Sequence, residues 1–164
     1  EIVPSWTMAP VVSAFQAMRG VQFVTAATMV AEAGDLRRFD HPRQLMAFLG
    51  LVPSERSTGD TRRQGGITKT GNASARKALV EAAWTYRHSA GVGKDHQQRQ
   101  AKLPQQVRDI AWKAQARLCA RYRRLTARGK RNTVVVTAVA REIAAFLWAI
   151  ARQVDPLPLP AANG

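Results

Sequence analysis

The chain has 164 residues, a length that fits one domain with a buried core, and its apolar fraction of 46% excludes wholesale disorder. The 25 Lys and Arg residues against 11 Asp and Glu residues give a formal net charge of +14 at pH 7. This excess favours a polyanionic partner, with nucleic acid first, an anionic membrane second and a merely solvated basic surface as the alternative. The single cysteine, Cys119, excludes an intrachain disulfide and a multi-cysteine zinc site.

The first predicted elements form a helical hairpin. Apolar residues at helical spacing predict a helix over Val11–Met18 and another over Val24–Ala33, which ends at Gly34. The turn "GVQFVTA" resembles that of a helix-hairpin-helix, in which backbone N–H groups bind a phosphate. Gln22 stands where the second glycine of that motif is expected, so a plain helical hairpin is an equal alternative.

Two further helices are predicted on either side of a polar stretch. Pro42 opens a short helix that ends at Gly50, with Asp40 or His41 as its N-cap. Asn72 caps the next helix. Residues 89–100, "SAGVGKDHQQRQ", predict an exposed loop because no apolar periodicity runs through them.

The C-terminal half predicts two long helices. Val107–Leu125 has an apolar stripe and an opposite basic face, which includes Arg117, Arg121 and Arg124. Asp109 is the only acidic residue nearby in the sequence, so we expect this face to contact phosphates. A buried helix with a β-branched start is predicted over residues 133–152, and the fold class is therefore mainly α.

The residues offer little conventional catalytic machinery. His41, His88 and His96 share no helical ligand spacing, which argues against a metal site or a Ser-His-Asp triad. The acidic residues are few and spread out, whereas two-metal phosphoryl transfer needs several converging carboxylates. We therefore predict no metal ligands in this chain.

The most distinctive stretch is "LVPSERSTGDTRRQGGITKTGN", residues 51–72. Its glycines permit close backbone approach to a phosphate, its arginines can neutralise phosphate charge, and it contains several hydroxyls. No histidine lies near enough in the sequence to act as a base. Composition favours a nucleic-acid-binding loop over an active site in which a serine attacks a phosphate, and both interpretations stay open at this point.

A longer pattern resembles a known family. The run from Arg19 to Trp84 contains "GVQFV", "AEAGDLRRF", "FLGLVPSERSTG", "GGITKTGN" and "EAA". It resembles the C-terminal domain of the IS-one-ten (IS110/IS116/IS902) family of insertion-sequence transposases, which are guided by a bridge RNA. The later run "RYRRLTARGKRNTVVVTAVAREIAAFLWAIA" is similar to the last helices of the same family, so the resemblance covers residues 6–152.

The resemblance implies a role for one serine. In this family a serine of the stretch Pro-x-x-x-Ser-[Ser/Thr]-Gly attacks DNA and forms a transient phosphoserine bond. That serine corresponds to Ser57, with Ser54 as the alternative. Basic residues around it are expected to bind nucleic acid on grounds of charge and position: Arg56, Arg62, Arg63, Lys69 and Arg76.

The resemblance also implies partners outside this chain. Family members carry an N-terminal domain with a DEDD set of carboxylates and Mg²⁺, bind a noncoding bridge RNA as well as DNA, and assemble as homo-oligomers. This chain lacks such a carboxylate set, so we expect it to be inactive alone. No membrane association is expected, and the expected location is the bacterial cytoplasm.

The expected organisation is a connector over residues 1–10, a serine-carrying helical domain over residues 11–152 and a flexible Pro-rich tail over residues 153–164. The domain is expected to be compact, with a helix-hairpin-helix-like N-terminal part and a Gly/Arg-rich catalytic loop. The leading hypothesis is the serine domain of a DNA transposase. The alternative is a non-catalytic remnant that binds DNA or RNA.

Overall fold

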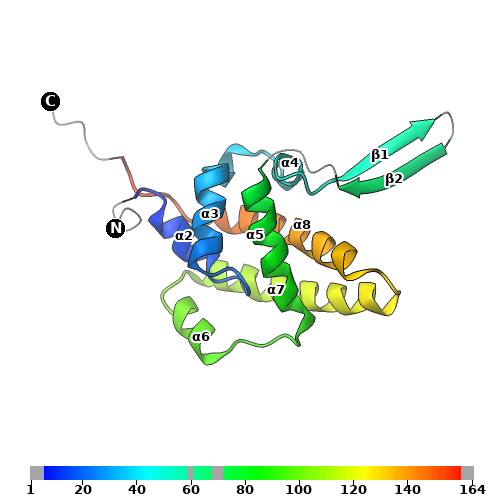
Figure 1. Cartoon of the computed structure of the whole chain (residues 1–164). Coiled ribbons are helices and arrows are strands. Elements are labelled where there is room, and N and C mark those ends of the chain that lie inside the picture. Colours follow the sequence, from blue (N-terminus) through cyan, green and yellow to red (C-terminus); the bar gives the residue numbers. More distant parts are fainter. Residues whose placement is uncertain (1–5, 59–60, 68–71, 160–164) are drawn as a thin grey trace.

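Helices account for most of the structure, a computed structural model that describes residues 6–58, 61–67 and 72–159. Over residues 53–58 and 61–67 it describes only the backbone. The mainly α class predicted from the sequence is confirmed (Figure 1). In chain order the elements are α2 (Ala9–Phe15), α3 (Phe23–Ala33), the 3₁₀ turn η1 (Leu36–Arg38), α4 (Pro42–Phe48), β1 (Pro53–Thr58), β2 (Thr61–Ile67), α5 (Ala73–Ala83), the 3₁₀ turn η2 (Trp84–Arg87), α6 (Lys94–Gln100), α7 (Gln105–Ala127) and α8 (Asn132–Ala151).

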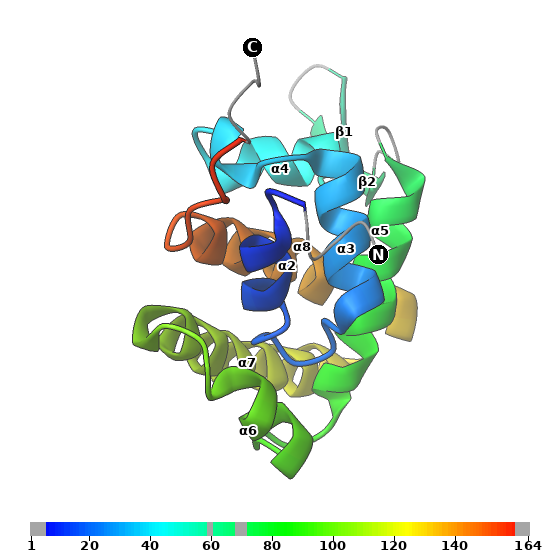
Figure 2. The ribbon, with the colours of Figure 1, turned by 90° about the vertical axis from the view of Figure 1, so that its left-hand side faces the viewer.

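Helix α8 is the centre of the core. It packs against α7, α5, α4 and α2, and residues from Val135 to Ala151 are buried along it. In Figure 2 it lies behind α2 and α3, between α4 and α7. Its length and apolar composition would also allow a membrane span, but half of the apolar window is buried against other helices. In this fold α8 is therefore a core helix.

Local signals predicted several helix ends. Pro42 occupies the first turn of α4, and His41 is its N-cap, with Nδ1 accepting a hydrogen bond from the Arg43 backbone N–H at 3.1 Å. The Asn72 side chain caps α5 by accepting from the Ala75 N–H at 2.9 Å. Helix α3 ends at Gly34, whose φ of 71° lies in the left-handed region that favours glycine. These three predicted ends are confirmed.

Residues 89–100 do not form a continuous loop, so that prediction was wrong. Lys94–Gln100 form α6, and His96 on this helix is buried. The His96 Nε2 lies 2.6 Å from the Ala17 carbonyl oxygen, which also accepts from the Gln100 side chain at 2.9 Å. Burial lowers the pKa of His96. Hydrogen bonds to a distant carbonyl hold this helix, and apolar periodicity could not reveal them.

The stretch expected to be a loop contains a two-stranded antiparallel hairpin. β1 and β2 pair from Pro53 opposite Ile67 to Thr58 opposite Thr61, with an irregularity between Pro53 and Glu55. The strands have no apolar alternation, so the sequence lacked the usual strand signal. The hairpin projects from the helical body at the end opposite the described chain ends (Figure 1).

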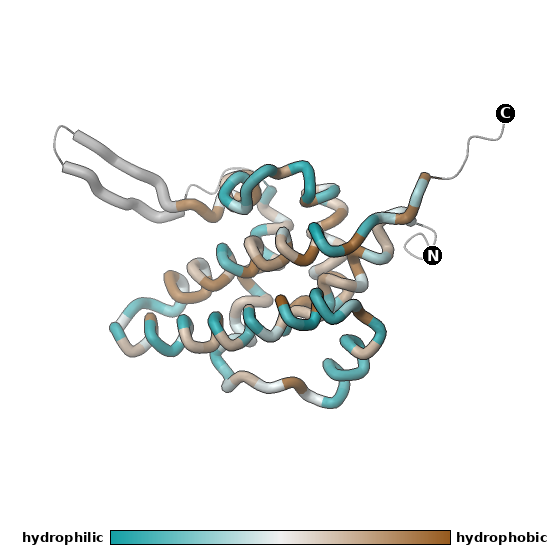
Figure 3. The backbone as a smooth tube through the Cα atoms, turned by 180° about the vertical axis from the view of Figure 1, so that it is seen from behind, coloured by the Kyte–Doolittle hydropathy of each residue, from teal (hydrophilic) through white to brown (hydrophobic). Residues whose placement is uncertain are grey.

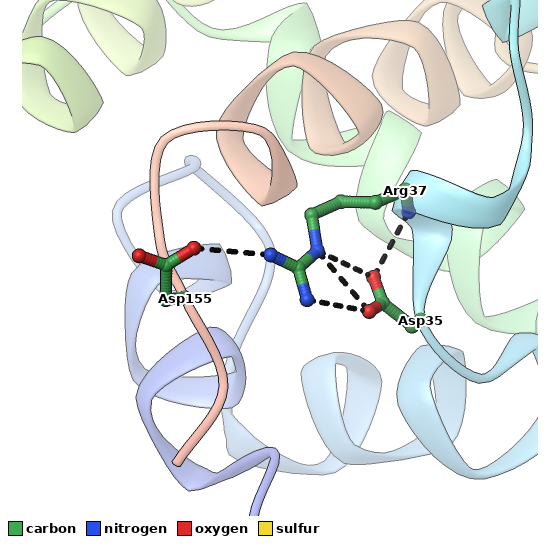
Figure 4. A network of polar contacts seen from close by, with 3 residues as sticks. All are labelled: Asp35, Arg37 and Asp155. Carbon is green, nitrogen blue, oxygen red and sulfur yellow. Dashed lines mark hydrogen bonds and ion pairs between the residues drawn. The ribbon is translucent and has the colours of Figure 1, made fainter. Parts of the chain in front are cut away.

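The described part of the expected tail contacts the body. Arg37 of η1 donates to both carboxylate oxygens of Asp35 and reaches Asp155 Oδ1 at 3.0 Å (Figure 4). The hydrogen bonds from Arg37 hold the pKa of the Asp35 carboxyl below its usual value. The Leu157 N–H donates to the Thr7 carbonyl at 2.7 Å. Asp155 and Leu157 therefore attach this part of the chain to η1 and to the segment before α2.

Candidate catalytic hairpin and nucleic-acid interface

The hairpin brings the predicted nucleophile beside predicted phosphate-binding residues. Ser57 pairs with Arg62 across the strands, and Arg56 pairs with Arg63. Direct partners in an antiparallel ladder are the nearest cross-strand neighbours. Arg62, five positions later in the sequence, thus becomes a direct neighbour of Ser57. Ser54 lies near the base of β1, whereas Lys69 is outside the described residues.

Two arginines from the helical body hold the segment that enters β1. Arg76 of α5 donates from Nη1 to the Leu49 carbonyl at 3.2 Å, and Arg141 of α8 donates from Nε to the Leu51 carbonyl at 2.7 Å. Leu49 and Leu51 are fully buried, and Gly50 between them has a φ of 70°. This segment is thereby fixed to both α5 and α8. Arg76 was predicted to bind nucleic acid, and the structure gives it this anchoring contact.

The chain that leaves the hairpin is also anchored. Asn72, five residues after β2 ends at Ile67, is the N-cap of α5 and donates from Nδ2 to Glu32 Oε2 of α3 at 2.5 Å. The Asn72 backbone N–H lies 3.4 Å from the Phe48 carbonyl oxygen at the end of α4. Both ends of the hairpin segment are therefore attached to the helical body close to α4.

The basic face of α7 is divided by an acidic residue that the sequence interpretation did not consider. Glu142 of α8 accepts a hydrogen bond from Arg117 Nε at 2.5 Å and forms an ion pair with Arg121 Nε at 2.6 Å. The Arg121–Glu142 contact lies within ion-pair distance, but its angles do not meet those of a hydrogen bond. The Glu142 side chain is only 17% exposed. Two of the three α7 arginines predicted to bind phosphate therefore already have a carboxylate partner.

The last turns of α7 keep unpaired basic residues. Arg124 and Arg128 are exposed, one helical turn apart, and neither forms an ion pair with any residue the structure describes. Lys130 and Arg131 follow in the exposed turn before α8. Figure 3 shows hydrophilic residues recurring along α7, in contrast to the largely apolar α8. The end of α7 and the start of α8 point toward the same end of the molecule as the hairpin (Figure 1).

Arg141 of α8, which contacts the segment before β1, is next to Glu142 in the sequence. Burial lowers the pKa of its guanidinium, the neighbouring positive charge of Arg121 lowers it further, and Glu142 opposes both effects. Arg117 and Arg121 thus share the carboxylate of Glu142, and Arg141 is the residue before Glu142 in α8. Neither Arg141 nor Glu142 was a predicted site residue. The signal available in the sequence was a charged pair in the middle of the apolar run "TAVAREIAAF".

The α2–α3 turn has a structural reason for its glycine. Gly20 has a φ of 80°, and a Cβ there would lie 2.6 Å from Thr85 Oγ1 and 2.7 Å from the Ala82 carbonyl oxygen. Gly20 is therefore required for packing against α5 and η2, independently of any phosphate. Gln22 is the N-cap of α3, and its side chain makes no capping hydrogen bond. Phosphate binding by this helical hairpin stays a prediction.

The described residues do not fit a catalytic metal. Across the described ranges, no three His, Cys, Asp or Glu side chains gather closely enough to hold an ion. Asp35 and Glu142 are engaged with arginines, and Glu32 with Asn72. The Mg²⁺ implied by the family resemblance therefore has no donor set among the described residues.

Comparison with known proteins places the sequence among transposases. Residues 12–101 match the family described as "Transposase IS116/IS110/IS902 family". The putative transposase y4qE of Sinorhizobium fredii is 58% identical over 153 residues, which are 93% of this chain and 39% of that protein. The transposase for insertion sequence element IS1111A of Coxiella burnetii is 41% identical over 42% of this chain and 19% of its own length. A probable family 20 transposase of Pseudomonas aeruginosa is 42% identical over 41% of this chain and 20% of its own length.

Proposed function

The chain belongs to the transposase IS116/IS110/IS902 family, and from that premise we propose that it is the part of a DNA transposase that carries the nucleophilic serine, Ser57. The chain spans about two fifths of the length of the putative transposase y4qE, so the activity of the intact protein is part of the proposal. The observation that carries it is the hairpin register, which pairs Ser57 with Arg62 and Arg56 with Arg63.

The proposed reaction is a transesterification at a DNA phosphodiester. The Ser57 hydroxyl loses its proton, its oxygen forms a bond to phosphorus, and the bond from phosphorus to one sugar oxygen breaks. The displaced sugar oxygen takes up a proton and leaves as a free hydroxyl end. One ester replaces another, so the phosphoserine link conserves the bond energy needed to rejoin the strand.

The arginines of the hairpin suit the charge that develops at the phosphate. A guanidinium presents several N–H donors that match two phosphate oxygens at once. Arg56 precedes Ser57 in the sequence, Arg62 pairs with Ser57, and Arg63 pairs with Arg56. Lys69 follows later in the sequence. The described residues hold no cluster of three His, Cys, Asp or Glu side chains, so the proposed part of this chain is to supply the nucleophile and the phosphate-binding arginines. We expect the base for Ser57 and the DEDD carboxylates to come from the portion that the longer relatives carry.

Nucleic-acid binding is expected to extend from the hairpin to α7. The exposed Arg124 and Arg128 and the following basic turn are suited to bind phosphates on the same end of the molecule. DNA is the partner that transposition requires. A bridge RNA and a homo-oligomer are further parts of the proposal that rest on the family resemblance.

The test uses a full-length transposase that carries this sequence. Incubation with its DNA should give a covalent protein–DNA adduct that survives denaturing electrophoresis. We expect Ser57→Ala to abolish this adduct while changing the DNA dissociation constant less than about twofold, because the hydroxyl contributes little to phosphate binding. Ser54→Ala is the matched control and should keep the adduct. An adduct that persists in Ser57→Ala would reject the assignment.

A second candidate function is nucleic-acid binding without cleavage, favoured by the unpaired arginines at the end of α7. This alternative predicts salt-dependent binding of DNA or RNA and no covalent adduct in the full-length wild-type protein. The same electrophoresis experiment therefore separates the two candidates.

A further inference from the structure

The segment before β1 is held from α8 by one side chain. Arg141 donates to the buried carbonyl of Leu51, two residues before β1 begins. A carbonyl in this position is removed from water, so the guanidinium satisfies an acceptor that would otherwise be unpaired. The contact joins residues 90 positions apart in the sequence. Arg141 therefore fixes where the strand of Ser57 leaves the helical body.

The next residue of α8 makes the corresponding contact to the basic helix. Glu142 accepts from Arg117 and pairs with Arg121, both on α7. Burial lowers the pKa of Arg141, and the positive charge of Arg121 lowers it further. A single carboxylate thus pairs with two arginines of α7. The hairpin base and the middle of α7 are linked through two adjacent residues of one rigid helix.

We propose that Arg141 and Glu142 form a positioning pair, in which Arg141 orients the Ser57 hairpin and Glu142 holds the α7 arginines, so that a phosphate backbone bound along α7 is presented to Ser57. The proposal rests on the proposed function of Ser57. Neither residue needs to touch the reacting atoms. Their effect is to set the placement of the nucleophile relative to the surface that binds the nucleic acid.

The two residues should have different signatures. Without Arg141, nucleic acid still binds α7 but the hairpin is less well oriented, so the reaction should slow at saturating DNA. Without the Glu142 charge, Arg117 and Arg121 lose a competitor for phosphate, so DNA should bind more tightly while the reaction slows. A role limited to stability would not raise the affinity for DNA in one variant and leave it unchanged in the other.

The experiment compares variants of the full-length transposase that carries this sequence. Arg141→Met keeps most of the side-chain length and removes the donor. Arg152→Met is the control at the C-cap of the same helix, because Arg152 lies over the Trp148 ring and away from the hairpin segment. We expect Arg141→Met to slow adduct formation at saturating DNA about tenfold or more, with a dissociation constant within about twofold of wild type. Arg152→Met should leave both unchanged. An Arg141→Met rate within about twofold of wild type overturns the proposal.

The Glu142→Gln variant tests the second half of the proposal. It should bind DNA several-fold more tightly and form the adduct several-fold more slowly at saturation, whereas unchanged affinity together with an unchanged rate overturns the coupling. Arg141→Lys, which retains the charge and a donor, should recover part of the rate lost in Arg141→Met. If Arg141→Met fails to fold, Arg141→Lys and Glu142→Gln carry the test, and wild-type rates in both reject the proposal.

A measurement independent of the chemistry separates this proposal from that for Ser57. Amide hydrogen exchange in β1 and β2 should accelerate about fivefold to tenfold in Arg141→Met, the effect of one lost hydrogen bond, while the core amides of α7 keep their rates. A wild-type protein that forms no adduct would reject the Ser57 function, yet faster exchange confined to the hairpin would still support Arg141 as its anchor. Unchanged exchange in the hairpin rejects that anchoring role.

Discussion

Two pairs of arginines on the same helix have different surroundings. Arg117 and Arg121 in the middle of α7 share the carboxylate of Glu142, whereas Arg124 and Arg128 at its end are exposed and form no ion pair with the described residues. Charge and helical spacing gave Arg117, Arg121 and Arg124 the same predicted role. The comparison shows that a basic helix face can contain one part that organises the protein and another part available to a partner.

The largest expected effect of this difference is on DNA affinity. The double variant Arg124→Ala/Arg128→Ala should bind DNA about fiftyfold to a hundredfold more weakly at about 0.1 M salt, because two phosphate contacts and their released counterions are lost. The slope of log affinity against log salt should fall by about two. Fluorescence anisotropy over a salt series measures both quantities. Arg117→Ala/Arg121→Ala is the matched double variant, and an equal loss there would remove the distinction between the two pairs.

The second expected effect is on folding stability, where the loss of Arg121 should matter more than the loss of Arg124. Arg121→Ala should lower the free energy of unfolding by about 1–2 kcal/mol, because it leaves the largely buried Glu142 carboxylate with one fewer cation. Arg124→Ala should change it by less than about 0.5 kcal/mol, as expected for an exposed residue without a charged partner. Urea unfolding of both variants checks this. Equal losses in the two variants would contradict the division of α7.

The smallest expected effect is a difference in coupling energy between the two arginines that pair with Glu142. Double-mutant cycles with Glu142→Gln should give a coupling energy for Arg121 that exceeds that for Arg117 by about 0.5 kcal/mol. The reason is that the Arg121 side chain is 29% exposed and the Arg117 side chain is 56% exposed, so water screens the second pair more strongly. Urea unfolding of the four proteins in each cycle measures the coupling. A larger coupling for Arg117 would show that hydrogen-bond alignment outweighs burial here.

The sequence predicted much of the helical framework because its signals are local. His41, Asn72 and Gly34 act within a few residues of their own positions, so the predicted helix ends agree with the structure. The apolar stripe of α7 likewise predicted its buried face, including Val107, Leu118 and Tyr122. Residues 94–100 escaped prediction because α6 is held by polar contacts to Ala17 rather than by an apolar stripe.

The candidate site was only partly accessible from the sequence. The family resemblance singled out Ser57 among several hydroxyls, but the pairing of Ser57 with Arg62 depends on the hairpin register. The role of Arg141 was hidden because its acceptor is a backbone carbonyl 90 residues away. Backbone acceptors have no sequence signature, since every residue carries one.

By itself, the sequence determined the family, the positions of most helices, the basic charge and the serine to test, because composition, short-range caps and helical periodicity act along the chain. Only the tertiary structure decided which arginines are paired and how the hairpin is attached. Ion pairs and hydrogen bonds depend on distance in space, and the packing of α8 against α7 and α4 brings Glu142 and Arg141 to partners far away in the sequence.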